Sequence, residues 1–331
     1  MSIGTEDIKD AGDIRDAGAH AGEEPGASAI GARAASDPAP GARAVSGPAV
    51  GGRAVSAPRA LLRLLASEVG LTFRRPRNIA MLAVLALIPV LIGVALRAFA
   101  GSGDGDGGGP AIFTRITGNG LFLTFAALSL LVQLLLPVAV AVVGGDSIAG
   151  EAGIGTLRYL LAAPAGRTRL LAVKYANAVV FCLAAVSVIA LSALIAGLVL
   201  FPAGPITLLS GGTIPLVDGL LRIGLVVLYV TAGMAALAAV ALAFSTLTEV
   251  AVGAIASTVV LVIVAQVLGV IPQLSVLQPY LLTHWWGGFD AVLRDPVATG
   301  DMGQGLLVFA AYIVVFGSVA WARFTGKDIS S

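Results

Sequence analysis

Charged side chains are scarce in this sequence of 331 residues. Asp, Glu, Lys and Arg make up 12% of it, about half of the quarter that is usual in soluble domains. Hydrophobic residues make up 57%, and they are concentrated in long stretches. A water-soluble fold could not cover itself with so few charges, whereas a bilayer accommodates such stretches. The composition therefore excludes an ordinary soluble domain and predicts a membrane protein.

Cysteine and histidine are nearly absent. The one cysteine, Cys182, lies inside an apolar stretch, and a single thiol can form neither an internal disulfide nor a cysteine-based metal site. The two histidines are His20 and His284. We therefore expect no metal site on this chain and interpret Cys182 as a small apolar side chain.

Ionisable residues are missing from the middle of the apolar stretches. A charge at the bilayer centre costs about 2.5–3.5 kcal/mol even on the lenient insertion scale, so it usually has a function. The absence weighs against intramembrane proteases and proton-coupled carriers, and it predicts a chain without catalytic residues. We interpret Gln133, Asn177, Thr231 and Gln266 as inter-helix hydrogen-bonding groups. A polar lining for a substrate path is the alternative.

Phosphate-binding loops for ATP are missing as well. The three lysines are Lys9, Lys174 and Lys327, and none completes the G-x4-G-K-[ST] pattern of such a loop. No basic patch with interleaved aromatic residues indicates nucleic-acid binding. We therefore expect neither a cofactor nor nucleic acid on this chain, and any ATP and Mg²⁺ would be bound by another polypeptide.

Residues 1–58 form a tail rich in Gly, Ala and Pro. Its ten-residue repeats begin at Gly31, Gly41 and Gly51. Repeats with so little apolar bulk cannot offset the entropy of ordering, so we predict a disordered cytoplasmic tail. A docking arm for a cytoplasmic partner is the alternative, and a deletion would test it.

The pattern then changes to an amphipathic segment at 61–77. Its leucines fall largely on one helical face, with Arg63 and Glu68 off that face, and Arg74 and Arg75 stand near its end. Such a helix directly before an apolar stretch is typical of the membrane–water interface.

Six apolar stretches follow, each near the ~20 residues that cross a hydrocarbon core of ~30 Å. The connection between the fourth and the fifth is short, so these two should form an antiparallel hairpin. We therefore predict an all-α integral membrane fold over 59–328, in which an interfacial helix precedes six transmembrane helices at about 79–99, 121–144, 174–200, 220–244, 250–271 and 304–322.

Lys and Arg are distributed unequally between the two sides of these spans. With a cytoplasmic N-terminus, that side holds ten of them outside the tail and the other side holds four. Cytoplasmic loops of membrane proteins carry such an excess. We therefore expect a multi-pass protein of the cell membrane with both termini in the cytoplasm.

The loop between the second and third spans, 144–174, carries the most specific pattern. Asp146 and Glu151 precede a short helical pattern, and Pro164 ends it, because the residue before a proline avoids the α region. Acids at a helix start and cations beyond its end complement the helix dipole. A well-capped loop helix explains these charges, but it requires neither the Gly-Thr-Leu sequence at 155–157 nor this spacing.

This loop resembles the second cytoplasmic loop of the type-2 permeases of ATP-binding-cassette (ABC) transporters, which reads roughly D-x4-E-x3-GTL-x2-LL-x2-P-x2-R-x6-K. The resemblance also covers the interfacial helix, the six spans and the last outer loop. It implies a permease subunit of an exporter, a homodimer or paired permease, and a coupling helix held by a separate ABC ATPase subunit. The interfacial helix would contact the same subunit. The matching loop residues are Asp146, Glu151, Gly155, Thr156, Leu157, Leu160, Leu161, Pro164, Arg167 and Lys174.

The last outer loop, 272–303, contains the tryptophan pair Trp285 and Trp286. Indole groups favour the headgroup layer, which is the interpretation we prefer from the sequence. In the resembled family this region forms short outer helices that close the pathway, so an outer gate is the second interpretation.

Three functions stay open at this stage. The resemblance favours a permease subunit that is not itself an enzyme. A non-transporting scaffold whose tail recruits partners is the alternative. A membrane-embedded enzyme is opposed by the missing acid and histidine pairs. Nothing in the spans selects a transported substrate.

Overall fold

The structure is a computed structural model, and it describes residues 57–100, 119–153, 166–202, 206–207, 213–294 and 299–326. Contacts divide the chain into Met1–Arg53 and Ala54–Ser331, and every described residue belongs to the second unit. Residues 1–56 of the predicted tail and residues 154–165 of the predicted coupling loop lie outside the described residues.

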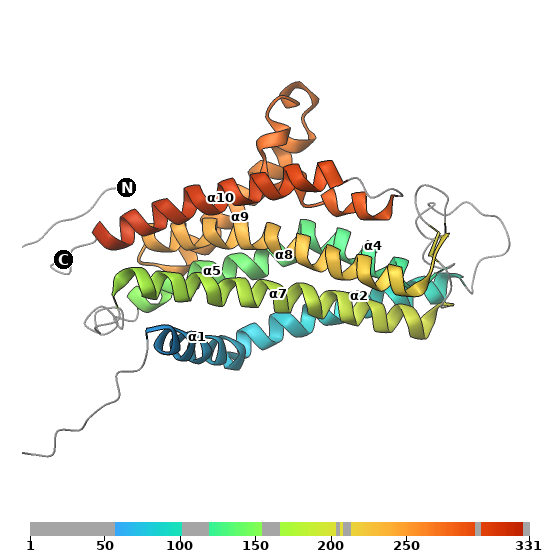
Figure 1. Cartoon of the computed structure of the whole chain (residues 1–331), viewed down its shortest axis with the longest axis horizontal. Coiled ribbons are helices and arrows are strands. Elements are labelled where there is room, and N and C mark those ends of the chain that lie inside the picture. The colour runs from blue at the N-terminus through green and yellow to red at the C-terminus, as the bar shows by residue number, and fades with distance from the viewer. Residues whose placement is uncertain are drawn as a thin grey trace, which may run out of the picture. The chain divides into compact units, whose positions relative to one another are not determined.

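The described residues are almost entirely helical (Figure 1). One hairpin, made of two strands of two residues each, precedes α8, and four short 3-10 helices connect α9 to α10. In chain order the elements are α1 (Ala57–Arg74), α2 (Pro76–Ala100), α4 (Phe122–Gln133), α5 (Leu135–Gly153), α7 (Arg167–Leu200), β1 (Ile206–Thr207), β2 (Thr213–Ile214), α8 (Leu216–Leu247), α9 (Ala251–Val270), η1 (Pro272–Leu274), η2 (Gln278–Tyr280), η3 (Leu282–Trp285), η4 (Gly288–Leu293) and α10 (Thr299–Gly326).

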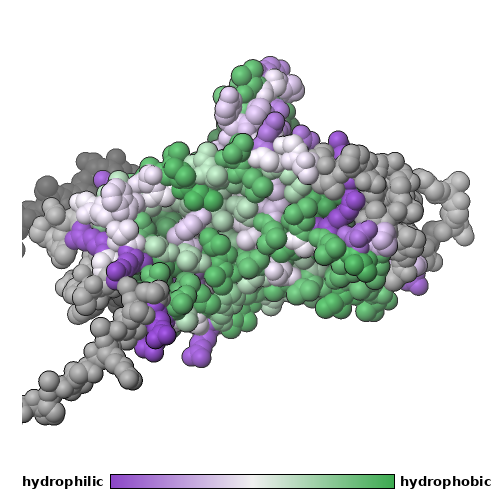
Figure 2. All heavy atoms as spheres, viewed as in Figure 1, coloured by the Kyte–Doolittle hydropathy of each residue, from purple (hydrophilic) through white to green (hydrophobic). Residues whose placement is uncertain are grey.

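Six of these helices, α2, α5, α7, α8, α9 and α10, are long and apolar enough to cross a membrane. The predicted all-α class and the number of spans therefore agree with the structure. In the most apolar window of α8, 78% is buried, against 17% in α2, α9 and α10. The outer helices consequently present apolar side chains, which gather over the middle of the face in Figure 2, with hydrophilic residues nearer the ends.

Small residues allow α8 to occupy the centre of the bundle. It packs against α10, α5, α7 and α9, and its alanine-rich segment 235–243 is buried. At Gly144 of α5, a Cβ atom would lie 2.7 Å from the Cβ of Ala241. Glycine is therefore required there for the close approach of α5 and α8.

The second predicted span, about 121–144, is divided at Leu134, whose φ of −131° and ψ of −64° separate α4 from α5. The physical reason is Pro137, which has no amide hydrogen to donate to the carbonyl of Gln133. Instead, Nε2 of Gln266 in α9 donates to that carbonyl. Gln266 is therefore an inter-helix hydrogen-bonding residue, as predicted, whereas the single continuous span was wrong.

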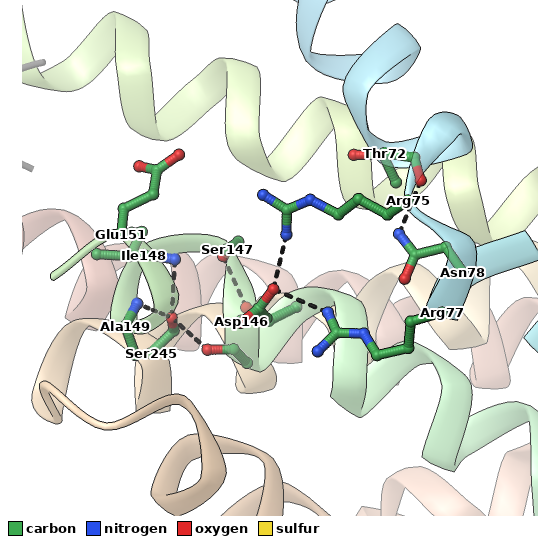
Figure 3. A network of polar contacts seen from close by, with 12 residues as sticks. Thr72, Arg75, Arg77, Asn78, Asp146, Ser147, Ile148, Ala149, Glu151 and Ser245 are labelled. Atoms are coloured by element: carbon green, nitrogen blue, oxygen red, sulfur yellow. Dashed lines mark hydrogen bonds and ion pairs between the residues drawn. The ribbon is translucent and has the colours of Figure 1, made fainter. Parts of the chain in front are cut away.

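The predicted interfacial helix at 61–77 corresponds to α1, which ends earlier than expected, at Arg74. Arg75 forms a bend, and α2 begins at Pro76. Proline suits a first helical position, because the amide hydrogen that it lacks would have no partner there. α1 packs against α7, and its junction with α2 faces α5 (Figure 3).

Candidate functional site: a charged cluster where α1 meets α5 and α7

Asp146 of α5 accepts hydrogen bonds from two arginines at the α1–α2 junction (Figure 3). Its Oδ2 atom lies 2.7 Å from Nη1 of Arg75 and 2.8 Å from Nη2 of Arg77. The Asp146 side chain is 16% exposed, while both arginines are about half exposed. Charge-assisted hydrogen bonds of this kind are stronger than neutral ones. They join α5 to the junction across about 70 residues of sequence.

Lys174 of α7 forms a second group of ion pairs. Its Nζ atom lies 2.6 Å from Oε1 of Glu151 in α5 and 3.8 Å from Oε2 of Glu68 in α1. The Lys174 side chain is only 3% exposed. A buried ammonium group needs such partners, because removing a charge from water costs several kcal/mol. Three helices therefore meet at this one ammonium group.

Neutral hydrogen bonds connect α1 to α7 and to α2. Asn177 of α7 donates through Nδ2 to Oγ1 of Thr72 at 2.8 Å, and Asn78 of α2 donates through Nδ2 to the Thr72 carbonyl at 2.9 Å. The last carbonyls of a helix have no partner within it, so Asn78 satisfies one of them at the end of α1. All three residues are buried. Asn177 thus forms an inter-helix hydrogen bond, as predicted.

Ser245 connects α8 to the same part of α5 (Figure 3). Its hydroxyl accepts from the amides of Ile148, at 3.0 Å, and Ala149, at 2.9 Å, and it donates to the Gly145 carbonyl at 2.7 Å. Ser245 is fully buried, and all of its hydrogen-bonding capacity is used. The central helix is therefore fixed against the turns of α5 that carry Asp146.

The other predicted coupling-loop residues do not all join the cluster. Arg167 begins α7, and its Nη1 atom donates to the Thr325 carbonyl near the end of α10 at 2.9 Å. The predicted coupling helix lies outside the described residues. Six residues of the predicted pattern lie there with it, namely Gly155, Thr156, Leu157, Leu160, Leu161 and Pro164.

The predicted interfacial-helix residues also divide. Glu68 and Arg75 belong to the cluster, as described above. Arg63 and Arg74 are exposed on α1. The cluster therefore involves one face of α1 and the bend that follows the helix at Arg75. The exposed residues Arg63 and Arg74 do not belong to it.

The two predicted outer tryptophans lie in different environments. Trp285 is half-buried, and its Nε1 atom donates to the Pro279 carbonyl at 2.8 Å. Trp286 is 1% exposed and belongs to the core. A Cβ atom at Gly233 of α8 would lie 3.2 Å from Cδ1 of Trp286, so glycine makes room for the indole. The headgroup interpretation was therefore wrong for Trp286, which packs inside the protein.

The charges of the cluster are balanced. Three carboxylates, from Glu68, Asp146 and Glu151, face the cations of Arg75, Arg77 and Lys174. Among the described residues, no group of three or more His, Cys, Asp or Glu side chains could hold a metal ion. A compensated cluster of this kind holds helices in fixed relative positions, and it connects α1, α2, α5 and α7 mechanically.

Sequence reasoning missed several members of the cluster. Arg77 and Asn78 follow a proline and resemble ordinary flanking residues, and Thr72 and Ser245 carry no motif. Their partners are distant in sequence, so spacing within one loop could not identify them. Polar residues near the ends of apolar stretches were the one available signal.

Comparison with known proteins bears on most of this bundle. Residues 111–330 match a family described as a protein of unknown function, DUF2705. The chain belongs to the DUF2705 family. The matched part contains α4 to α10, and with them Asp146, Glu151, Lys174 and Ser245 of the cluster. It begins after α1 and α2, so the arginines that pair with Asp146 precede it. Among curated proteins, no match to the chain is found.

Proposed function

We propose that the chain is the transmembrane permease subunit of an ABC exporter, coupled to a separate ATPase subunit through the loop at 145–174. The proposal rests on the ion pairs that residues at the two ends of this loop form. Asp146, Glu151 and Lys174, which belong to the coupling-loop pattern, attach the loop ends to each other and to α1.

These ion pairs and hydrogen bonds suggest how a displacement of the loop would move the spanning helices. The Glu151–Lys174 pair holds α5 and α7 together where the loop leaves the bundle. The Asp146 pairs transfer movement of α5 to the start of α2. Arg167 carries movement of α7 to the end of α10. A partner that pulls on the loop would therefore move four spanning helices together.

In this proposal the α1 end of the bundle faces the cytoplasm of the cell, together with both termini. ATP and Mg²⁺ bind to the ATPase subunit, and a second permease chain completes the pathway as a homodimer or a paired subunit. An outer gate would be formed by the segment that contains Trp285 and Trp286. Tyr229 of α8 donates to the Trp285 carbonyl at 2.9 Å, so this gate would move with α8.

The test is affinity purification of the tagged chain from native membranes, followed by identification of co-purifying proteins and measurement of ATP hydrolysis. We expect a stoichiometric ABC ATPase whose activity this chain stimulates. The double variant Glu151→Ala with Arg167→Ala should still insert, with a lower unfolding midpoint because the buried Lys174 loses its nearer carboxylate, and it should lose the stimulation. The matched control, Asp301→Ala with Arg97→Ala, removes one acidic and one basic side chain at exposed positions outside the loop and the cluster and should keep it.

Two results would overturn this proposal. Normal ATPase stimulation in the Glu151 and Arg167 variant would remove the role of the loop. A chain that purifies without an ATPase, or with partners that depend on residues 1–58, would favour the alternative of a membrane scaffold with a recruiting tail.

A further inference from the structure

An open apolar groove lies between α9 and α10 and shares no residue with the charged cluster. Its volume is about 670 Å³, within the roughly 300–1,000 Å³ of small-molecule sites. Phe244 of α8 forms part of its floor, and Val315 and Phe316 of α10 line one side. On α9 the lining runs from Ser257 to Leu268, about 16 Å at 1.5 Å per residue.

One end of the groove is closed by the segment that follows α9. Leu282 of η3 lines this end and is buried. Oη of Tyr312 in α10 donates to the Tyr280 carbonyl at 3.1 Å, and Nε2 of Gln278 donates to the Gly269 carbonyl in α9 at 3.0 Å. The end wall is thus attached to both sides of the groove, which is therefore a preformed part of the fold.

A separate polar pocket of about 380 Å³ lies at the ends of α8 and α10, beyond Phe244 and Phe316 of the groove along these helices. Thr246 and Glu249, at the end of α8 and the turn to α9, line this pocket together with Arg323 of α10. Arg323 is exposed and lies seven residues beyond Phe316, about 10 Å along the helix. The guanidinium group of Arg323 therefore follows the apolar groove along α10, on the helix that lines one side of it.

We propose that the groove and the pocket together bind one glycerophospholipid, with an acyl chain in the groove and the phosphate at Arg323. Water would find almost no hydrogen-bond partners between these walls, and an empty groove would lose dispersion contacts. Arginine binds phosphate through paired charge-assisted hydrogen bonds.

A helix of a second copy is the other candidate occupant, but the apolar spans of this chain carry no acidic residue in their middle to pair with Arg323, whereas a phospholipid carries a phosphate. A single acyl chain is far thinner than a helix and is present throughout the bilayer around α9 and α10. The site is independent of the proposed ATPase coupling, because no residue of the charged cluster contributes to it.

The test uses the full chain in membranes of phosphatidylethanolamine and phosphatidylglycerol, with a trace of phosphatidylethanolamine that carries a photoreactive diazirine in one acyl chain. After illumination, mass spectrometry locates the labelled residues. Ala311→Phe fills the groove, and its control Ala310→Phe adds the same group to an exposed neighbour that does not line it. Arg323→Gln removes the anchor, and its control is Arg169→Gln on α7.

We expect labelling concentrated on the facing sides of α9 and α10. It should fall roughly tenfold in Arg323→Gln, as expected for the loss of a charge-assisted hydrogen bond, and at least as far in Ala311→Phe, whose ring fills the groove. It should stay unchanged in both controls. Equal labelling of Ala311→Phe and Ala310→Phe, or equal labelling of α2, would overturn the proposal. So would cross-links between copies at the groove, which would make a second chain the occupant. If Ala311→Phe does not fold, Arg323→Gln decides alone.

Discussion

Lys174 is the residue whose environment demands most explanation, because a charged side chain is buried at 3% exposure with two carboxylates around it. Replacing Lys174 by methionine would remove the ammonium group that pairs with both Glu68 and Glu151. Breaking a buried ion pair from one side typically costs about 3–5 kcal/mol. We therefore expect Lys174→Met to lower the midpoint of thermal unfolding strongly, measured on the purified chain in detergent.

The control removes the carboxylates as well. In the triple variant Lys174→Met, Glu68→Gln and Glu151→Gln, no charge is left without a partner, so most of the lost stability should return. A triple variant as unstable as Lys174→Met would show that the lysine acts through packing of its alkyl chain and not through its charge.

Asp290 of η4 gives a prediction about pH. Partial burial raises the pKa of its carboxyl group above the ordinary value, and the nearby charge of Arg294 opposes this. The folded state therefore favours the protonated form, and this contribution to stability is present at low pH and is lost as the pH rises through the raised pKa. Asp290→Asn should be slightly more stable than the natural chain near neutral pH, with no difference in strong acid.

Unfolding midpoints from about pH 4 to pH 8 would measure that difference. The effect should be small, because the Asp290 residue remains exposed. Removing Arg294 as Arg294→Gln should enlarge it, since the opposing charge is lost. A difference between Asp290→Asn and the natural chain that grows toward acid would contradict this assignment.

At the scale of elements, the break between α4 and α5 leaves the Gln133 carbonyl without a donor in its own helix, and a side chain of another helix donates to it instead. Pro137 cannot donate to the Gln133 carbonyl, and Gln266 donates to it from α9. Gln266→Leu should therefore cost about 1–3 kcal/mol, because the Gln133 carbonyl is exposed on the apolar surface of the bundle, where lipid cannot replace the lost donor. In the Pro137→Ala background an amide hydrogen is restored at position 137, so the same substitution should cost much less.

A double-mutant cycle on unfolding free energies measures this coupling. Additive effects of Gln266→Leu and Pro137→Ala would mean that the two residues act separately. The matched substitution Gln278→Leu, which removes an amide from η2 instead, should show no coupling to Pro137→Ala.

The same elements show how far sequence reasoning reaches. Hydropathy predicted a candidate span near each of the six long apolar helices, because a stretch of about 20 apolar residues is rarely stable anywhere but in a bilayer. It could not show that 121–144 is interrupted, since leucine and valine continue across the break and only Pro137 marks it. It also placed Lys174 at the end of a span, whereas α7 begins at Arg167 and buries the lysine about two turns inside.

The candidate site was predictable only in part for a related reason. Asp146, Glu151 and Lys174 stood out by spacing within one loop. Their partners are Glu68 in α1 and Arg75 and Arg77 at the α1–α2 junction, and only the folded bundle brings these segments together. The burial of Trp286 depends in the same way on Gly233 in a different helix.

For the whole molecule, the distribution of Lys and Arg predicts which side faces the cytoplasm. Ser67 lies exposed on α1 and Asp301 lies exposed at the start of α10. In intact cells, a membrane-impermeant maleimide should label Asp301→Cys, whereas Ser67→Cys should react only after permeabilisation. The opposite pattern would invert the orientation and place the charged cluster on the outer side.

The single native thiol has a practical consequence. Cys182 is 0% exposed within α7, so reagents that need solvent contact should leave it untouched. The natural chain therefore serves as its own unreactive background for spin labels and fluorophores. Paired probes on cysteines introduced into α1 and η4 could then follow both ends of the bundle, with no further substitution needed to remove a background thiol.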